Sequence, residues 1–173
     1  AMDCKTLMAP IKPSLCTDEL AGVVIDFMVE KHMGLVPVIE PDGKFAGLIS
    51  GDSLMGHMLP KSLAAMHPTN NLSYLSETPD EMLERLEDIR DRPIGEFIDR
   101  DVEVAGPDTP LIDALMLIKN KQYVVPVVDH DQKLIGAISF FSVLYALNKN
   151  YDRDEVQKAK EHAREERKKD DSQ

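Results

Sequence analysis

Residues 35–50 read LVPVIEPDGKFAGLIS, and residues 124–139 repeat the pattern without a gap as VVPVVDHDQKLIGAIS. β-Branched residues crowd both arms of each stretch, and a polar turn separates the arms. In the first copy the turn is Pro41-Asp42-Gly43, whose residue types favour tight turns. Each stretch therefore predicts a β-hairpin. The proline of each Val-Pro-Val run has no N–H to donate, which predicts an edge strand or an interrupted ladder.

A helix is predicted before each hairpin. Thr17 can cap a helix that begins at Asp18, and Thr109 followed by Pro110 is a second start signal. Apolar residues at helical spacing then form one stripe in each helix: Leu20, Val23, Val24, Phe27 and Met28 in the first, and Leu111, Ala114, Leu115 and Ile118 in the second. Both helices carry further apolar residues outside the stripe. We therefore expect them to be buried on more than one side, by a core and by a subunit interface.

The remaining segments complete two copies of one β-α-β-β-α unit. A short extended segment precedes each first helix, at residues 14–16 and 102–104, and a short helix follows each hairpin, over residues 51–59 and 140–147. The predicted fold class is therefore α+β, with two tandem units, an inserted helix between them and a polar helix at the end.

Domain boundaries follow from this repeat. We assign residues 2–59 to the first repeat, 60–92 to a helical insertion or linker, 93–149 to the second repeat and 150–173 to a polar C-terminal helix or tail. In the insertion, Thr78-Pro79-Asp80-Glu81 predicts a capping box with proline at the first helical position. The tail is nearly all polar, so a solvated helix with i,i+4 ion pairs is expected. A weak coiled-coil contact with a partner is the alternative.

The composition argues against several classes of protein. With 31 acidic and 20 basic residues the formal charge is −11, which disfavours a broad nucleic-acid surface. Apolar runs fall short of the roughly 20 residues that cross a bilayer, and no secretory signal is recognised, so we expect a cytoplasmic protein without a membrane segment. Cys4 and Cys16 fit a reduced compartment better than a disulfide or metal site. The five histidines are scattered and match no catalytic motif, so no enzyme is expected.

The order of extended segment, helix, Val-Pro-Val strand, turn, glycine-containing strand and helix, occurring twice, resembles the CBS domain pair, or Bateman module. The resemblance covers residues 2–59 and 93–149. It implies that the copies pack through their sheets as a pseudo-two-fold pair. It also implies clefts between the copies that bind adenine nucleotides or adenosyl ligands, here AMP, ADP, ATP or S-adenosylmethionine, with no cofactor required. A homodimer through the repeat helices, acting on a regulated enzyme or transporter, is the implied assembly.

Two serines lead the list of expected site residues. Ser50 and Ser139 each end the second hairpin strand where a helix begins, and a hydroxyl beside unpaired N–H groups suits a phosphate. The alternative is that both serines are only N-caps. In the family pattern Gly-x-x-Ser/Thr-x-x-Asp, the hydroxyl contacts phosphate and the Asp contacts ribose. Ser53 and Ser142 occupy the Asp position here and lack its charge, while Asp52 stands one residue early.

The resemblance also implies a wall around the base, built from the first extended segment and the start of the Val-Pro-Val strand. The matching residues are Ile11, Lys12, Gly34 and Leu35 in the first copy, and Asp101, Val102, Tyr123 and Val124 in the second. Tyr123 could stack on a base, or it could pack at a strand edge with a solvated hydroxyl. Three functions stay open: a ligand-sensing module, a dimerisation or assembly module with degenerate pockets and, ranked last, an enzyme.

Overall fold

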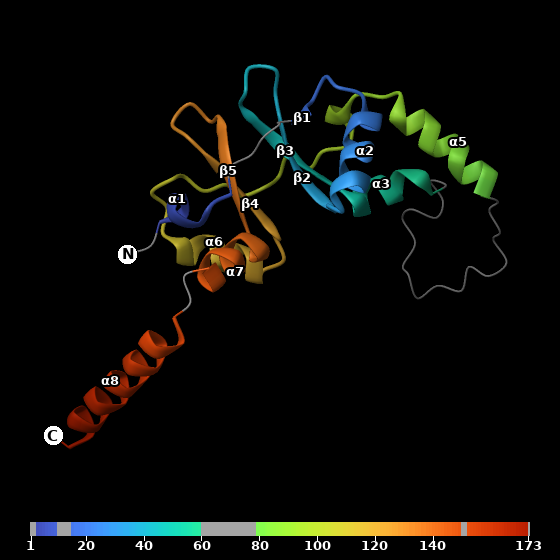
Figure 1. Cartoon of the computed structure of the whole chain (residues 1–173). Helices are drawn as coiled ribbons and strands as arrows, with labels where there is room; N and C mark the ends of the chain where they lie inside the picture. The colour runs from blue at the N-terminus through green and yellow to red at the C-terminus, as the bar shows by residue number, and fades with distance from the viewer. Residues whose placement is uncertain (1–2, 10–14, 60–78, 150–151, 173) are drawn as a thin grey trace.

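Both predicted hairpins are present, and they lie beside each other (Figure 1). The structure is a computed structural model that describes residues 3–9, 15–59, 79–149 and 152–172. Its strands are β1 (Leu15–Cys16), β2 (Leu35–Ile39), β3 (Phe45–Ser50), β4 (Val124–Val128) and β5 (Leu134–Ser139). β2 pairs antiparallel with β3, and β4 with β5. The two registers match, since Pro37 lies opposite Leu48 and Pro126 opposite Ala137.

Among the described residues, each proline lies outside the pairing of its strand with the preceding segment. β1 pairs parallel with β2, but its pairing begins opposite Val38, one residue after Pro37. β2 is therefore the middle strand of the order β1-β2-β3, although its proline has no neighbour in β1. In the second repeat the equivalent of β1 is a single bridge between Ala105 and Val127.

The extended segment predicted at residues 102–104 is not a paired strand. The Gln122 side chain accepts a hydrogen bond from the Glu103 N–H at 3.1 Å and donates one to the Glu103 carbonyl at 2.7 Å. Because a side chain uses both backbone groups of Glu103, the strand partner of β4 is Ala105 instead. The pairing that corresponds to β1 thus falls on Ala105, one residue after the predicted extended segment.

The two hairpins are joined at their turns. The Phe45 N–H donates to the Gln132 carbonyl at 2.9 Å, and the Leu134 N–H donates to the Gly43 carbonyl at 3.3 Å. These bonds flank an antiparallel bridge between Lys44 and Lys133, which are equivalent residues of the two repeats. The repeats thus meet about a pseudo-two-fold axis near this bridge.

The longer helices are α2 (Ala21–Lys31), α3 (Gly51–Met58), α5 (Pro79–Arg90), α6 (Leu111–Lys119), α7 (Phe140–Lys149) and α8 (Arg153–Asp171). The prediction that Thr17 caps the first of them is wrong. Residues 17–20 form a turn before α2, because the Thr17 hydroxyl donates to Glu40 at 2.9 Å and the Glu19 carboxylate accepts the Cys16 N–H at 3.0 Å. In the second repeat the Thr109 hydroxyl closes the equivalent turn by accepting the Gly106 N–H at 2.8 Å.

The buried face of α2 differs from the predicted stripe. Ala21, Val24 and Met28 face the core, whereas Leu20 and Val23 remain about half exposed, at 50% and 48%. Residues 21, 24 and 28 share one face because they are spaced at i, i+3 and i+7, whereas Leu20 lies before the helix. The stripe predicted for α6 agrees better, with Leu111 and Ala114 buried.

The segment that begins each repeat packs on the other repeat. α1 (Cys4–Leu7) contributes Cys4 and Leu7 to the core of the second repeat. Conversely, Ile94 of the short helix η1 (Ile94–Glu96) and Phe97 belong to the core of the first. Equivalent backbone bridges, Ala9 to Ala137 and Leu48 to Asp99, fix the two exchanged segments against β5 and β3. The boundaries at 59/60 and 92/93 stay a prediction.

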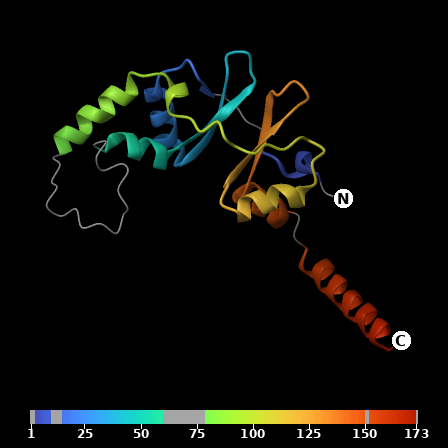
Figure 2. The ribbon, with the colours of Figure 1, turned by 180° about the vertical axis from the view of Figure 1, so that it is seen from behind.

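The inserted helix α5 covers α2 and α3. Ile89 is 2% exposed in the first core, and Arg90 forms a two-pronged ion pair with Asp26 of α2 at 2.9 and 3.1 Å. The predicted capping residue Thr78 lies outside the described residues. The polar helix predicted at the end of the chain is present as α8, has no buried residue and extends away from the repeats in both views (Figures 1 and 2). No helix of the described residues has the length and apolar character needed to cross a membrane.

Candidate functional site

A cavity of about 580 Å³ lies between the two repeats, and we call it the first cleft. It is lined by Gly34, Leu35, Leu48, Ser50, Asp52, Asp99, Asp101, Val102, Asn120, Lys121, Gln122 and Tyr123. The strand end that carries Ser50 belongs to the first repeat, while the segment after η1 and the start of β4 belong to the second. Asp101 and Val102, the predicted wall residues of the second repeat, therefore line the same cleft as Ser50 of the first repeat. The exchanged segments cause this crossing, because Asp99 bridges to Leu48 of β3.

Ser50 is the N-cap of α3. Its hydroxyl oxygen accepts the Ser53 N–H at 3.1 Å, and the first N–H of the helix, from Gly51, is donated to the Gly34 carbonyl at 2.8 Å. Ser53, at the position of the family's Asp, does not line the cleft. Its hydroxyl donates to the Phe97 carbonyl at 3.3 Å and so anchors the exchanged segment.

The far wall of the first cleft is held by Gln122. Its amide bonds both backbone groups of Glu103 and also donates to the Val124 carbonyl at 3.1 Å. These bonds fix Val102 and Tyr123 on adjacent segments. Helix α6 ends at Lys119, and Lys121, two residues later, lies in the left-handed region with a φ of 74°.

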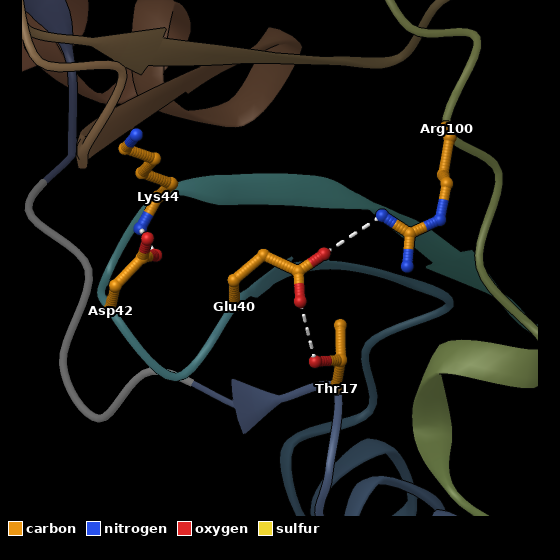
Figure 3. A network of polar contacts seen from close by, with 5 residues as sticks. All are labelled: Thr17, Glu40, Asp42, Lys44 and Arg100. Carbon is orange, nitrogen blue, oxygen red and sulfur yellow. Dashed lines mark hydrogen bonds and ion pairs between the residues drawn. The ribbon is translucent and has the colours of Figure 1, made fainter.

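Arg100 fastens the same segment to the first hairpin. Its Nη1 lies 2.8 Å from Glu40 Oε1, and the second oxygen of that carboxylate accepts the Thr17 hydroxyl (Figure 3). The Arg100 guanidinium and the Thr17 hydroxyl together lower the pKa of the Glu40 carboxyl. The neighbouring Asp42 carboxylate caps the hairpin turn by accepting the Lys44 N–H at 3.0 Å (Figure 3). The positive charge of Arg100 is thereby paired outside the cleft.

A second cleft, of about 520 Å³, adjoins the first through Gly34, Leu35 and Tyr123. Its other lining residues are His32, Met33, Ile118, Val124, Ser139, Phe140 and Phe141. No carboxylate is among these lining residues, all of which the structure describes. A further cavity of about 600 Å³, which we call the α7 cavity, lies on the other side of Ser139 and extends along α1 and α7 to Lys149.

Ser139 begins α7 as Ser50 begins α3, but its hydrogen bonds differ. Its hydroxyl accepts the Ser142 N–H at 3.2 Å, while the Ser142 hydroxyl accepts the Ser139 N–H and donates to the Ser139 carbonyl, both at 2.9 Å. Ser142 is thus a partner in a reciprocal cap. Among the described residues, no bond from Phe140 to Tyr123 repeats the one from Gly51 to Gly34.

Of the predicted site residues, seven line the first cleft: Gly34, Leu35, Ser50, Asp52, Asp101, Val102 and Tyr123. Ser139 and Val124 line the second cleft, and Ser142 lines the α7 cavity. Ile11 and Lys12 lie outside the described residues. A ligand role for each of these residues stays a prediction.

Sequence reasoning missed several lining residues, chiefly Asp99, Lys121, His32 and Phe141. His32 and Lys121 are equivalent in the two repeats and both have positive φ, 53° and 74°. Extending the repeat alignment back from the hairpins to the helix ends could have paired them. Asp99 had no such signal, because only the exchange of segments brings it to the end of β3.

The thiols of Cys4 and Cys16 have raised pKa values. Burial raises the pKa of the Cys4 thiol, with Asp113 and Asp3 adding to the effect, and desolvation likewise raises the pKa of Cys16. A raised pKa keeps a thiol protonated and a poor nucleophile. Within the described residues, no group of histidine, cysteine and acidic side chains is arranged to hold a metal ion.

Comparison with known proteins agrees with this architecture. The CBS domain family matches residues 94–149. The protein MJ1426 of Methanocaldococcus jannaschii is 28% identical over 138 residues, which cover 75% of this chain and 82% of that protein. The crystal structure of the CBS-pair protein CBSX2 from Arabidopsis thaliana superposes with a TM-score of 0.65 at 21% identity, over 86% of this chain and 96% of that chain.

A structure of CBSX2 in complex with AMP superposes with a TM-score of 0.63 at 20% identity, over 88% of this chain and all of that chain. At this identity the likeness concerns the fold. It extends over both repeats, whereas the family match falls on the second. The CBS domain family thus matches residues 94–149, and the two repeats together have the fold of the CBS-pair structures.

Proposed function

We propose that this protein is a regulatory, non-enzymatic module that binds an adenine nucleotide in the second cleft, with the phosphate of the nucleotide at Ser139. The observation that carries the proposal is the position of Ser139, directly before α7 and among the residues that line a cavity with no carboxylate in its described lining. A helix N-terminus favours an anion through its N–H groups and its partial positive charge.

The aromatic lining of the second cleft supports the adenine part of the ligand. Tyr123 and Phe140 line it and are more than half exposed, so their rings are accessible to a base. Stacking of a base on an aromatic ring contributes roughly 1–3 kcal/mol. A cavity of this size also lies within the usual range of roughly 300–1,000 Å³ for small-molecule sites. The AMP complex of CBSX2, which has the same fold, adds support.

A regulatory role is inferred because both repeats contribute residues to the second cleft. His32 to Leu35 come from the first repeat, and Tyr123, Val124 and Ser139 come from the second. A ligand bound between them contacts both repeats and so favours one relative arrangement over others. A regulated enzyme or transporter would respond to that arrangement.

Calorimetric titration with AMP tests the proposal. Ser139→Ala is expected to weaken AMP binding at least about tenfold, because it removes a hydrogen bond to a charged phosphate. Ser50→Ala is the matched control, since it removes the equivalent helix cap at a similar cost in stability while leaving the second cleft intact. Absence of heat with AMP, ADP, ATP and S-adenosylmethionine would count against the proposal. An equal loss of affinity in both variants would reject the assignment to Ser139.

A second function, assembly of a homodimer, is favoured by the exposed face of α6 and α7. Phe141 and Tyr145 are 78% and 72% exposed, and Ile112 and Met116 of α6 are also exposed. Apolar side chains gathered on one face mark interaction surfaces. We propose that two copies pair through α6 and α7. Light scattering at micromolar concentration should give twice the chain mass of 19.4 kDa. Tyr145→Glu should halve the measured mass, and a monomeric wild type would reject the pairing.

A further inference from the structure

The two clefts carry different charges at equivalent positions. Ser50 corresponds to Ser139 in the repeat, but Asp52 corresponds to Phe141. Asp99, which bridges to Leu48, corresponds to Ala9, which bridges to Ala137. The first cleft is therefore lined by carboxylates where the second cleft and the adjoining α7 cavity present apolar side chains.

The carboxylates of the first cleft have little opposing charge. Of the described residues that line this cleft, Lys121 is the only lysine or arginine, whereas Asp52, Asp99 and Asp101 are exposed. Arg100 stands between two of these acids in the sequence, but its guanidinium is directed to Glu40 (Figure 3). A phosphate brought to Ser50 would enter a cavity of net negative charge, and like charges at short range repel.

Binding at Ser50 would be disfavoured for a second reason. Gly51, the first residue of α3, already donates its N–H to the Gly34 carbonyl at 2.8 Å. Asp52 in the same turn interacts favourably with the helix dipole, and it thereby occupies the electrostatic role that an anionic ligand would fill. In α7 the first turn contains no acidic residue.

We infer that the first cleft excludes phosphorylated ligands and accepts an adenosine-like ligand without a phosphate, with Asp52 and Asp101 setting this specificity. Leu35 and Val102 offer apolar contacts to a base, and the carboxylates can accept hydrogen bonds from ribose hydroxyls. The inference rests on the proposed function in assigning AMP to the second cleft. One chain then binds one AMP, although it contains two pseudo-symmetric clefts.

The stoichiometry of AMP binding tests this specificity. The full chain is titrated calorimetrically at an ionic strength on the order of 10 mM, where charges act over about 30 Å. The wild type is expected to bind one AMP, and Asp52→Asn combined with Asp101→Asn is expected to bind two. The control combines Asp170→Asn with Asp171→Asn at the end of α8, which changes the net charge equally and should leave one AMP bound. Adenosine affinity should fall in the cleft variant, since a neutral amide oxygen accepts a weaker hydrogen bond from a ribose hydroxyl than a carboxylate does.

The outcomes separate this inference from the proposed function. Equal AMP stoichiometry in the wild type and the Asp52→Asn, Asp101→Asn variant overturns the inference, as does a wild type that already binds two. If the wild type binds no AMP but the variant binds one, the proposed function fails and the specificity of the first cleft stands. Circular dichroism verifies that the double variant is folded, and Asp52→Asn alone replaces it if it is not.

Discussion

Glu40 and Arg100 connect the first hairpin to the segment that enters the second repeat, with Oε1 and Nη1 2.8 Å apart. The carboxylate also accepts the Thr17 hydroxyl, so one side chain joins the turn before α2, the hairpin and the wall of the first cleft. This contact links the repeats through charge, in addition to the backbone bridges.

The first prediction concerns the pH dependence of this contact. Because Arg100 and then Thr17 lower the pKa of Glu40, its contribution to stability is present above the pKa of a free glutamate, about 4.3, and is lost as pH falls through the folded-state pKa. Glu40→Gln should therefore lower the free energy of unfolding at pH 7 by up to about 1 kcal/mol, as expected for a partly exposed pair. The change is measured as a lower melting temperature. The difference should shrink at pH 3.

Asp42→Asn is the control for this measurement, because an asparagine oxygen can still accept the Lys44 N–H. It should show no comparable pH-dependent difference. A Glu40→Gln effect that is the same at pH 3 and pH 7 would show that the ion pair is not its cause.

The second prediction concerns the glycine that both repeats keep in the second hairpin strand. A Cβ on Gly47 would overlap the Asp99 carbonyl oxygen, which belongs to the exchanged segment and is held by hydrogen bonds to Leu48. Gly47→Ala should therefore lower the free energy of unfolding by about 1–3 kcal/mol in denaturant titrations. Gly136→Ala should cost less, since the closest atom there is the sulfur of the flexible Met8 side chain, at 2.7 Å.

Gly56→Ala provides the matched control. Gly56 lies in α3 with nothing within 4 Å of an added Cβ, so alanine there should be neutral or stabilising by up to about 1 kcal/mol. If Gly47→Ala were as stable as Gly56→Ala, the exchanged segment would not lie against β3 as described.

The third prediction concerns the docking of α5. Ile89 is 2% exposed in the first core, so Ile89→Ala should lower the free energy of unfolding by about 2–4 kcal/mol. The Arg90 to Asp26 pair is solvated, and removing it should have a much smaller effect. A double-mutant cycle with Arg90→Ala and Asp26→Ala measures the coupling. A coupling larger than the effect of Ile89→Ala would contradict this ranking.

The fourth prediction concerns α8. None of its residues is buried, and its side-chain hydrogen bonds and its ion pair with another described residue, His162 to Glu166, lie within the helix or its caps. A chain that ends at Asn150 should therefore keep the unfolding free energy of the repeats within about 0.5 kcal/mol. The loss of helical signal in circular dichroism should correspond to α8 alone. A substantial drop in the melting temperature would indicate that α8 packs on the repeats.

The sequence by itself determined the local elements and their duplication. The alternation of β-branched residues around a polar turn specifies each hairpin, and a serine before a helical stripe specifies the start of α3 and of α7, because these signals act over a few residues. The start of α2 was misassigned for the opposite reason. Thr17 satisfies the local rule for a cap, but its hydroxyl binds Glu40, 23 positions away.

Only the tertiary structure decided which residues share a cleft. The exchange of segments brings Asp99 and Asp101 into the cavity of Ser50, and the packing of the two repeats brings His32 and Gly34 into one cavity with Tyr123 and Ser139. No periodicity encodes such contacts, because they depend on how two folded repeats pack against each other. The two serines are equivalent in the sequence, and it is this packing that surrounds one with carboxylates and the other with aromatic rings.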